Sequence, residues 1–521
     1  MANPRLASLV PVALLATLMA LGCSDSDGGT TPTPLVTNST QWTSRNPADP
    51  TAGTWKPFVL DSATQISVPA PAQNLAASTQ SELNEVRTAL GSLSPLERAR
   101  VSKWNTANQS RVWREQYLNI LILNARVGVP SMSRIYAGFE AAVSDAQLAA
   151  WAHQYQFKRP RPEQLDARID PVVDTPQNPA YPSDRAAAAG AAETMLAYFF
   201  PSKAAEVHAL ADEVIEAQLN AGLNLRSDLT AGRALGVQVA NRVIAALEAD
   251  GREATALDGV LDPTPHRTIE AVSAAGLPID ISVANYSDVM AFEPLARAGQ
   301  HYDDSILWAH TSPMDPTAGT WLPLAMTKAE LDPIDLPAPP ANSAQETIEC
   351  MDEVKEALEK VNTVSDFYMA NIVAKYAYDP PGIWFVEALD KQLAASGYSA
   401  VRVARATGIA HLAIHDGLLA CWREKYRYNK PRPHMLDPQM VTNIPTPPHP
   451  SYPSGHATCG GAGDTVLRAL FPDTAAEYGH LFHENNNARV WGGVHYRYDM
   501  TAGNQVGQQV AELLLERYWP E

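Results

Sequence analysis

Cysteine is scarce in this chain of 521 residues, which has four, and no two of them stand in a C-x-x-C pair. Zinc sites built from cysteine pairs are therefore not expected. One cysteine, Cys23, lies near the amino terminus. The other three, Cys350, Cys421 and Cys459, permit at most one disulfide among themselves, and a Cys421–Cys459 pair is one hypothesis for an exported protein.

Basic residues are outnumbered: the chain has 39 Lys and Arg against 57 Asp and Glu, which gives a formal net charge of −18. Proteins bind nucleic acid backbones through basic patches, so an acidic surface argues against nucleic acid as a partner. An anion site in this protein would have to be a local cluster of cations. Small molecules are the expected partners, and the sequence does not indicate an oligomeric state.

Long apolar runs are missing after the first 22 residues, since no later run reaches 18 residues. The run Leu9–Leu21 follows Arg5 and is too short to cross a bilayer, so residues 1–22 are predicted to be a signal peptide. The "ALGC" that ends it resembles a bacterial lipobox, with Cys23 as the lipidated first residue of the mature chain. Residues 23–39 are predicted to be a flexible tether. We expect export and anchoring to the cell envelope, in the periplasm or at the outer membrane, through this lipid alone; plain secretion is the alternative.

Several stretches of the first half recur in the second half at a constant spacing. "WAHQYQFKRPRPEQLD" (151–166) corresponds to "WREKYRYNKPRPHMLD" (422–437), which begins 271 positions later. "NPAYPSDRAAAAG" (178–190) and "HPSYPSGHATCGG" (449–461) stand at the same spacing, and "DPTAGTW" is also present once in each half. The constant spacing predicts an internal duplication.

Much of the chain has the pattern of amphipathic helices, with apolar residues at i, i+3 and i+4, as in "AAEVHALADEVIEAQLN" and "VGQQVAELLLERY". Runs that alternate apolar and polar residues, as strands do, do not stand out. The prediction is an all-α protein of two tandem helical bundles. We expect a degenerate bundle at residues 40–275 and a catalytic bundle at residues 278–521.

Three blocks in the second half carry charged and imidazole side chains at distinctive spacings. They are Lys425-x6-Arg432-Pro433, Pro453-Ser454-Gly455-His456 and Arg489-x5-His495-x3-Asp499. The second block indicates a loop that enters a helix with Ser454 near the N-cap, where free N–H groups and the helix dipole favour an anion. Gly455 would let the backbone approach an oxyanion closely.

The first and third blocks supply three cations on separate segments: Lys425, Arg432 and Arg489. Three cations are costly in an apolar helical protein unless a polyanion neutralises them. His495 and Asp499 are four residues apart, so on a helix they would share one face, with the carboxylate holding one ring nitrogen. The other ring nitrogen is then free to attack or to ligate. His456 stands next to the anion loop and is a candidate acid–base residue.

These blocks resemble the signature shared by vanadium-dependent haloperoxidases and the type 2 phosphatidic acid phosphatase superfamily, which includes soluble bacterial acid phosphatases. All three occur in the family's order, and one departure is Ala488, where the family usually has Ser. The resemblance implies that the equatorial oxygens of vanadate or phosphate are held by Lys425, Arg432, Ser454, Gly455 and Arg489. It also implies that His495 bonds vanadium or attacks phosphorus, that His456 is the acid–base residue and that Asp499 orients the site.

The residues around the blocks resemble haloperoxidases more than phosphatases, as in "PSGHA" and "GVHYRYD". Trp422 matches a tryptophan near the halide site of fungal chloroperoxidases, and His449 matches a histidine of algal bromoperoxidases. The expected activity is oxidation of halide by hydrogen peroxide with vanadate as the cofactor, and bromide or iodide is favoured. The alternative is a soluble acid phosphatase that forms a phosphohistidine on the same site without vanadate. A non-catalytic anion binder is the third alternative.

The first half lacks both histidines. At the spacing of 271, Lys425, His456, Arg489 and His495 correspond to Gln154, Arg185, Gln218 and Asn224, whereas Arg161, Ser183 and Asp228 are kept. Without a nucleophile or a proton carrier, the first bundle is predicted to be inactive and to pack on the catalytic one. The resemblance implies the same arrangement, with two bundles and one active site. The alternative is a vestigial anion site that uses Arg161 and Arg185.

One further cluster, "HLAIHD", places His411, His415 and Asp416 at a spacing that could ligate a metal. No third ligand block accompanies it, and Asp416 corresponds to Asp145 in the first half. We therefore expect this segment to be a structural helix rather than a metal site.

Overall fold

The computed structural model describes residues 41–125, 127–252, 314–377, 380–437 and 439–519. The regular elements in these ranges are helices, and no β-strand occurs among them, so the prediction of an all-α protein is confirmed. Among these residues, no helix combines the length and the apolar character that a membrane span requires. The predicted signal peptide at 1–22, Cys23, the tether at 23–39 and the expected boundary between 275 and 278 lie outside the described residues.

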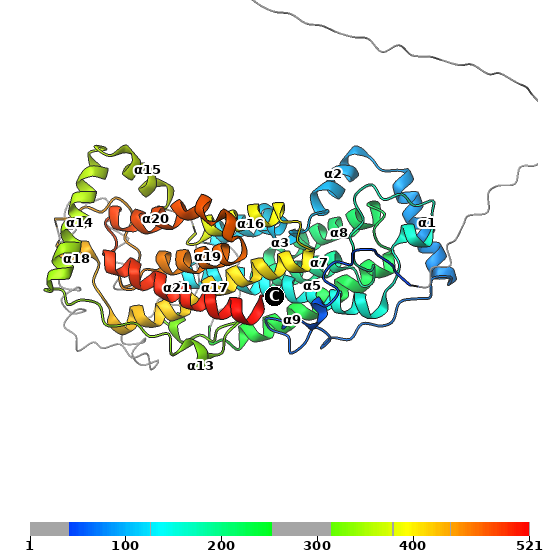
Figure 1. Ribbon diagram of the computed structural model, residues 1–521, viewed down its shortest axis with the longest axis horizontal. Coiled ribbons are helices and arrows are strands. Elements are labelled where there is room, and N and C mark those ends of the chain that lie inside the picture. Colours follow the sequence, from blue (N-terminus) through cyan, green and yellow to red (C-terminus); the bar gives the residue numbers. More distant parts are fainter. Residues whose placement is uncertain (1–40, 126, 253–313, 378–379, 438, 520–521) are drawn as a thin grey trace, which may run out of the picture. The chain divides into compact units, whose positions relative to one another are not determined.

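The first half of the described chain consists of helices joined by loops (Figure 1). In chain order these are η1 (Ala52–Thr54), α1 (Ala77–Gly91), α2 (Pro95–Trp104), α3 (Gln109–Trp113), η2 (Arg114–Leu118), α4 (Asn119–Ala125), α5 (Val129–Phe157), α6 (Pro162–Leu165), α7 (Asp184–Phe199), η3 (Pro201–Lys203), α8 (Ala204–Asn220) and α9 (Arg226–Glu248).

The second half has the same character. Its elements are η4 (Ala318–Thr320), α13 (Lys328–Leu331), α14 (Gln345–Asn362), α15 (Phe367–Lys375), α16 (Ile383–Ala395), α17 (Ala400–Tyr428), α18 (Pro433–Leu436), α19 (Gly455–Leu470), η5 (Pro472–Thr474), α20 (Ala475–Trp491) and α21 (Arg497–Tyr518).

The helix bounds repeat at the spacing of the sequence repeat. Helices α5 and α17 both have 29 residues, and they begin 271 positions apart, at Val129 and Ala400. The same spacing separates α7 from α19, with 16 residues each, and α8 from α20, with 17 residues each. The two halves therefore repeat the order and length of these helices.

The two longest helices, α5 and α17, pack against each other, and each also packs against two long helices of its own half. Helix α17 packs on α19 and α21, and α5 packs on α7 and α9 (Figure 1). Both α5 and α17 are buried along most of their length. A helix that is buried on all sides belongs at the centre of a core, so these two helices form the inner layer of the fold.

The "HLAIHD" segment of α17 makes contacts that hold α17 to its surroundings. The His411 ring stacks on Tyr136 of α5 with 5.3 Å between centroids, and His415 Nδ1 lies 3.0 Å from Ser133 Oγ. The Asp416 carboxylate accepts from three consecutive backbone N–H groups, 324–326, each at 3.1 Å. Asp145 of α5 accepts from residues 58–60 in the same way. These side chains are therefore structural ties between a long helix and its neighbours.

Helices α19 and α21 approach each other closely because glycine lines their contact. A Cβ atom on Gly507 would lie 2.0 Å from the carbonyl oxygen of Thr458, and one on Gly503 would lie 2.4 Å from that of Ser454. The close approach lets the backbone N–H of Ser454 donate to the carbonyl oxygen of Asp499 at 3.0 Å. The start of α19 is thus fixed beside the start of α21, where two of the three sequence blocks lie.

Candidate functional site

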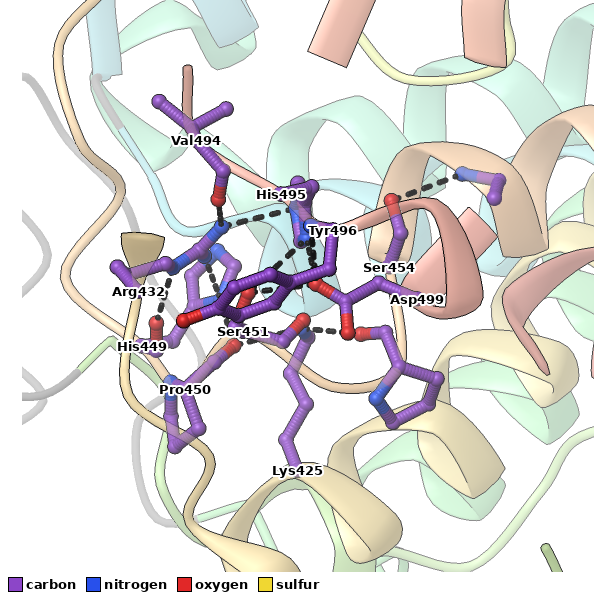
Figure 2. Close-up of polar contacts among 12 residues, drawn as sticks. Lys425, Arg432, His449, Pro450, Ser451, Ser454, Val494, His495, Tyr496 and Asp499 are labelled. Carbon is purple, nitrogen blue, oxygen red and sulfur yellow. Dashed lines mark hydrogen bonds and ion pairs between the residues drawn. The ribbon is translucent and has the colours of Figure 1, made fainter. Parts of the chain in front are cut away.

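The structure brings the three blocks of the second half together at the ends of five helices (Figure 2). Trp422 and Lys425 lie near the end of α17, Arg432 is the N-cap of α18, Ser454 is the N-cap of α19, Gly455 and His456 begin α19, Arg489 is near the end of α20, and His495 and Asp499 flank the start of α21. Residues from distant parts of the chain therefore share one site.

His495 is held by a carboxylate on one side and faces a guanidinium on the other. Its Nδ1 lies 2.9 Å from Oδ2 of Asp499, and its Nε2 lies 2.9 Å from Nη1 of Arg432. The carboxylate can only accept and the guanidinium can only donate, so Nδ1 carries the hydrogen and Nε2 carries the lone pair. Burial, and then Arg432, Lys425 and Arg489, lower the pKa of His495 well below its usual value, so the ring is neutral.

The expectation that His495 and Asp499 share one face of a helix is wrong in its geometry. His495 precedes α21, whose N-cap is Tyr496, and Asp499 is in the first turn of that helix. Oδ2 of Asp499 accepts from the backbone N–H of Tyr496 at 3.1 Å while it also accepts from the imidazole. The carboxylate therefore caps the helix and orients His495 with the same oxygen.

Ser451 completes this arrangement, and the sequence motifs did not identify it. Its hydroxyl donates to Oδ2 of Asp499 at 2.6 Å. Burial raises the pKa of Asp499, and the Ser451 hydroxyl opposes that rise. The residue at the corresponding position of the first half is Ala180, which cannot donate. This difference between the two halves is the signal that could have found Ser451, since His456 and His495 are also replaced in the first half, by Arg185 and Asn224.

Arg432 is occupied by acceptors of the protein itself. Its Nε donates to the carbonyl oxygen of His449 at 3.1 Å, and its Nη1 donates to that of Val494 at 2.6 Å. Its Nη2 lies 3.0 Å from Nδ1 of His449, and Nη1 also faces His495. Burial lowers the pKa of Arg432 to about 10, so it remains a cation at neutral pH. Arg432 therefore ties together the two segments that carry the histidines.

Lys425 is also engaged with the protein. Its Nζ donates to the carbonyl oxygens of Pro450 at 2.8 Å, of Ser451 at 3.0 Å and of Pro453 (Figure 2). An ammonium group has three hydrogens, so these three carbonyls use all of them. Burial lowers the pKa of Lys425. As it is placed, Lys425 holds the loop that precedes α19.

Arg489 is the cation of the site that keeps open donors. Its Nη1 donates to the carbonyl oxygen of Tyr376 at 3.3 Å, and its buried Nε has no hydrogen-bond partner among the described residues. Burial, and then the neighbouring Arg432, lower the pKa of Arg489 to about 9. An unpaired buried guanidinium is costly, which indicates that it is matched by a ligand.

The positive charge of the site is not balanced by carboxylates at contact distance. In the described part of the chain, none of Lys425, Arg432 and Arg489 has an Asp or Glu oxygen within the 4.0 Å of an ion pair. The buried carboxylate of the site, Asp499, accepts from Ser451, His495 and the Tyr496 backbone instead, and its Oδ1 has no partner among the residues that the structure describes. The arrangement is therefore suited to an anion with several negative oxygens.

The start of α19 has the form expected of an anion site. The Ser454 hydroxyl accepts from the backbone N–H of Ala457 at 3.3 Å, as an N-cap does. The N–H groups of Gly455 and His456 belong to the first turn, where no intrahelical acceptor exists. His456 is partly exposed, and burial, and then Arg489, lower its pKa well below the usual value. Its ring is therefore neutral at neutral pH.

The two predicted halide-pocket residues lie against each other. The rings of Trp422 and His449 are 4.8 Å apart between centroids, and both side chains are buried. Nε1 of Trp422 donates to the carbonyl oxygen of Met314 at 3.2 Å. A Cβ atom on Gly455 would lie 3.0 Å from the Trp422 ring, so the glycine makes room for the indole. The pair thus forms an aromatic wall behind the start of α19.

The hypothesis of a Cys421–Cys459 disulfide is wrong, because both residues are free thiols. Both are buried, and Sγ of Cys421 lies 3.7 Å from the carbonyl oxygen of Pro453, to which it can donate. Burial raises the pKa of each thiol, so both stay protonated and act as small apolar side chains. Cys350 is likewise a free, buried thiol.

The first half reproduces the framework of the site with other side chains. Gln154 donates to the carbonyl oxygen of Pro182 at 2.8 Å, as Lys425 does to Pro453. Asn224 donates to the carbonyl oxygen of Ala180 at 2.9 Å and offers no imidazole. Arg161 donates to acceptors on Asn178, Pro179 and Leu223, in the pattern that Arg432 shows. The loop geometry is thus kept where the reactive groups are absent.

Solved structures of known proteins share the fold of this chain. No family model matches the chain, and no curated protein matches it. The crystal structure of a bacterial vanadium-dependent iodoperoxidase is similar, with a TM-score of 0.53 and 19% sequence identity over 82% of this chain and 97% of that chain. A holo-type bacterial vanadium-dependent chloroperoxidase is similar at a TM-score of 0.49 and 17% identity, over 75% of this chain and 92% of that one. The similarity to the iodoperoxidase shows a common fold, as the sequence motifs implied.

Proposed function

We propose that this protein is a vanadate-dependent enzyme of the haloperoxidase type, which oxidises halide, with bromide or iodide preferred, at the expense of hydrogen peroxide. One observation carries the proposal: the lone pair of His495 Nε2, set by Asp499, faces a group of buried cations that no contacting carboxylate neutralises in the described residues. An oxyanion with an electrophilic centre fits both features, because its oxygens meet the cations and its centre meets the lone pair.

The chemistry of the donors fits vanadate. Arg489 has a buried Nε without an acceptor in the described part of the protein, and the first turn of α19 has backbone N–H groups to offer. The oxygens would be held by Arg432, Ser454, Gly455 and Arg489, and the vanadium by His495 Nε2. Lys425 would join the oxygen ligands only by releasing one of the three backbone carbonyls to which it donates. When bound, vanadate would activate hydrogen peroxide for attack by a halide ion.

The side chains of the protein set and move protons around this group. Ser451 and Asp499 keep the hydrogen of His495 on Nδ1, so that Nε2 retains its lone pair. Arg432 must turn its Nη1 hydrogen from Nε2 towards the oxyanion, while its other donors keep it in place. His456, which is neutral and partly exposed, would exchange protons between the site and solvent. Trp422 and His449 would line the halide or substrate pocket.

The fold shared with a bacterial vanadium-dependent iodoperoxidase supports this proposal over the alternatives. A soluble acid phosphatase is the second candidate, because a neutral histidine with an open Nε2 is also what a phosphohistidine intermediate requires. In that enzyme, His456 would protonate the leaving group and no vanadate would be needed.

The two candidates predict opposite responses to vanadate. The purified protein would be incubated with orthovanadate and assayed for bromination or iodination of a phenol with hydrogen peroxide, and in parallel for hydrolysis of p-nitrophenyl phosphate. We expect vanadate-dependent halogenation. Hydrolysis that proceeds without vanadate and is inhibited by it, with no halogenation, would favour the phosphatase.

His456→Ala separates binding from turnover. The variant should bind vanadate as the natural protein does but lose most of its halogenation, because the proton carrier is gone. His483→Ala is the matched control, since His483 is an exposed histidine on the neighbouring helix α20. A loss of vanadate binding in His456→Ala would place this histidine among the ligands instead.

We further propose that the bundle at 40–275 is an inactive copy of the bundle at 278–521 and that the chain is exported and lipid-anchored through Cys23. The repeated helix bounds and the repeated Arg161 and Arg432 contacts support the first statement. Mass spectrometry of the amino-terminal peptide tests the second. A lipid on Cys23 is expected, and an unmodified amino terminus would favour plain secretion.

A further inference from the structure

A cavity of about 810 Å³ lies in the first half, at the position that corresponds to the catalytic site in the second half. Its wall includes Trp151, Asn178, Asp184 and Arg185, which stand 271 positions before Trp422, His449, Gly455 and His456. The loop before α17 and its first residues, 397–402, close the cavity on another side. The first bundle thus keeps an open cavity at the position that corresponds to the site of the second half.

Arg185 is an unmatched cation in this cavity. Its side chain is buried, with 8% of the residue surface exposed, and it lines the cavity. In the described part of the chain, Arg185 donates no hydrogen bond and has no carboxylate within ion-pair distance, and its buried Nε has no partner. The other arginine of the wall, Arg402, is neutralised by Asp49, whose Oδ1 lies 2.6 Å from its Nη2. Arg185 is therefore the cation left for a ligand.

A second feature points to the same place. Arg185 belongs to the first turn of α7, a helix of 16 residues whose N-cap is Ser183. The backbone N–H groups of that turn have no intrahelical acceptors, and the positive end of the helix dipole adds to the guanidinium. Arg161, the other candidate for a vestigial anion site, does not contribute, because its donors are taken by acceptors on Asn178, Pro179 and Leu223.

The charges and the size of the cavity select the class of anion. Asp184 stands next to Arg185, and its Oδ2 has no partner within the described ranges. Asp174 also lines the wall, so a highly charged oxyanion would be repelled. The site of the second half brings three cationic residues together, Lys425, Arg432 and Arg489, whereas among the described residues of this cavity one guanidinium, that of Arg185, lacks a protein acceptor. A single negative charge is therefore the better match. The volume exceeds that of a bare ion, and Val173, Pro176, Tyr398 and the Trp151 ring supply an apolar and aromatic wall.

We propose that the first bundle carries a binding site for a small organic monocarboxylate, held by Arg185 and the start of α7, with its apolar or aromatic body against the cavity wall. The planar guanidinium suits the two oxygens of a carboxylate. The site is distinct from the catalytic one and does not depend on the halogenation chemistry.

The test measures binding of benzoate to the full-length protein by isothermal titration calorimetry, with inorganic phosphate as the comparison anion. Benzoate should bind more tightly than phosphate, and Arg185→Gln should weaken benzoate binding by about 10-fold or more. Arg242→Gln, an exposed arginine of the same bundle, is the matched control and should bind as the natural protein does. Arg489→Gln should also retain benzoate binding, because it alters the catalytic site alone.

A second variant keeps the test decisive if Arg185→Gln does not fold. Asn46 is exposed and lines the cavity, so Asn46→Trp would fill it without touching Arg185 and should also reduce benzoate binding. Benzoate binding that is unchanged in a folded Arg185→Gln or in Asn46→Trp would overturn the proposal. Phosphate that binds more tightly than benzoate, or a natural protein that binds no benzoate, would overturn it as well.

Discussion

Asp499 Oδ2 and His495 Nδ1 are 2.9 Å apart, and the same oxygen also accepts from Ser451 and from the backbone of Tyr496. One carboxylate oxygen thus caps α21, fixes the tautomer of the imidazole and leaves the lone pair on Nε2, which faces Arg432. The consequence is that the site depends on Asp499 being ionised. A protonated Asp499 would no longer stabilise the hydrogen on Nδ1, and the lone pair on Nε2 would be lost.

Ser451→Ala should weaken vanadate binding and move its dependence on pH. The hydroxyl donates to a carboxylate, and loss of such a bond costs about 1.5–3 kcal/mol. Because the Ser451 hydroxyl lowers the pKa of Asp499, its removal should raise that pKa, and vanadate affinity should then be lost at a higher pH as the solution is acidified. Equilibrium dialysis against vanadate over a pH series checks both effects. Ser365→Ala, on an exposed serine, is the control. If the two variants lose vanadate affinity at the same pH on acidification, the role assigned to Ser451 is wrong.

Arg489→Gln should weaken vanadate binding by about 1.5–3 kcal/mol, the range for a charge-assisted hydrogen bond, with little effect on folding. Glutamine is the residue at the corresponding position 218 of the first half, where it is buried, so the substitution fits this fold. Calorimetry with vanadate measures the loss, and Arg468→Gln, on the exposed face of α19, is the matched control. An unchanged affinity in Arg489→Gln would mean that the oxyanion lies elsewhere.

His449→Asn should make the protein less sensitive to acid. Burial, and then Lys425 and Arg432, lower the pKa of His449 well below 6.5 in the folded state. On unfolding, the ring regains its ordinary pKa and binds a proton below about pH 6.5, so folding stability falls as the pH falls. In the variant, the slope of the free energy of unfolding against pH should be smaller by up to about 1.4 kcal/mol per pH unit, which is the contribution of one proton. Asparagine suits this position, because Asn178, at the corresponding position of the first half, accepts a hydrogen bond from Arg161, which corresponds to Arg432.

Urea unfolding at about pH 7.5 and about pH 5 measures this slope on either side of the ordinary pKa of histidine. His480→Asn is the control, because His480 is exposed on α20. If His449→Asn and the natural protein lose the same stability on acidification, the buried ring is not a source of acid sensitivity.

Gly507→Ala should destabilise the protein by about 1–3 kcal/mol, the range for overpacking a tight contact. The added Cβ atom would lie 2.0 Å from the carbonyl oxygen of Thr458, so α19 and α21 would have to separate. Gly479→Ala is the opposite case, because it lies in α20 with its nearest neighbour, Arg468 Nη2, at 3.6 Å, and alanine there should stabilise by about 0.4–1 kcal/mol. Thermal unfolding of both variants measures these shifts, and a Gly507→Ala variant as stable as the natural protein would contradict the close packing of α19 and α21.

Helix periodicity in the sequence was sufficient to predict the all-α class, and the spacing of 271 was sufficient to predict which helices would correspond. The N-cap at Ser454 followed from its place before a helical run, and the structure has it there. These features depend on local sequence, in which side chain pattern and backbone geometry are directly linked. The relation of His495 to Asp499 was only half predicted, because the contact exists but a loop residue and a helix N-terminus make it.

Which cations are free could not be predicted, and only the tertiary structure decided it. Lys425, Arg432 and Arg161 donate to backbone carbonyls of loops that are distant in sequence. Among the described residues, by contrast, Nε of Arg489 and Nε of Arg185 find no acceptor. Motif spacing shows which residue types are present. Every residue has a backbone carbonyl, however, so the sequence does not show which carbonyls will accept from a given cation. The sequence therefore determined the fold class and the residues available for chemistry. The packing of loops against helix ends decided which of those residues can meet a ligand, because a buried charge is neutralised by whichever acceptor the fold brings to it.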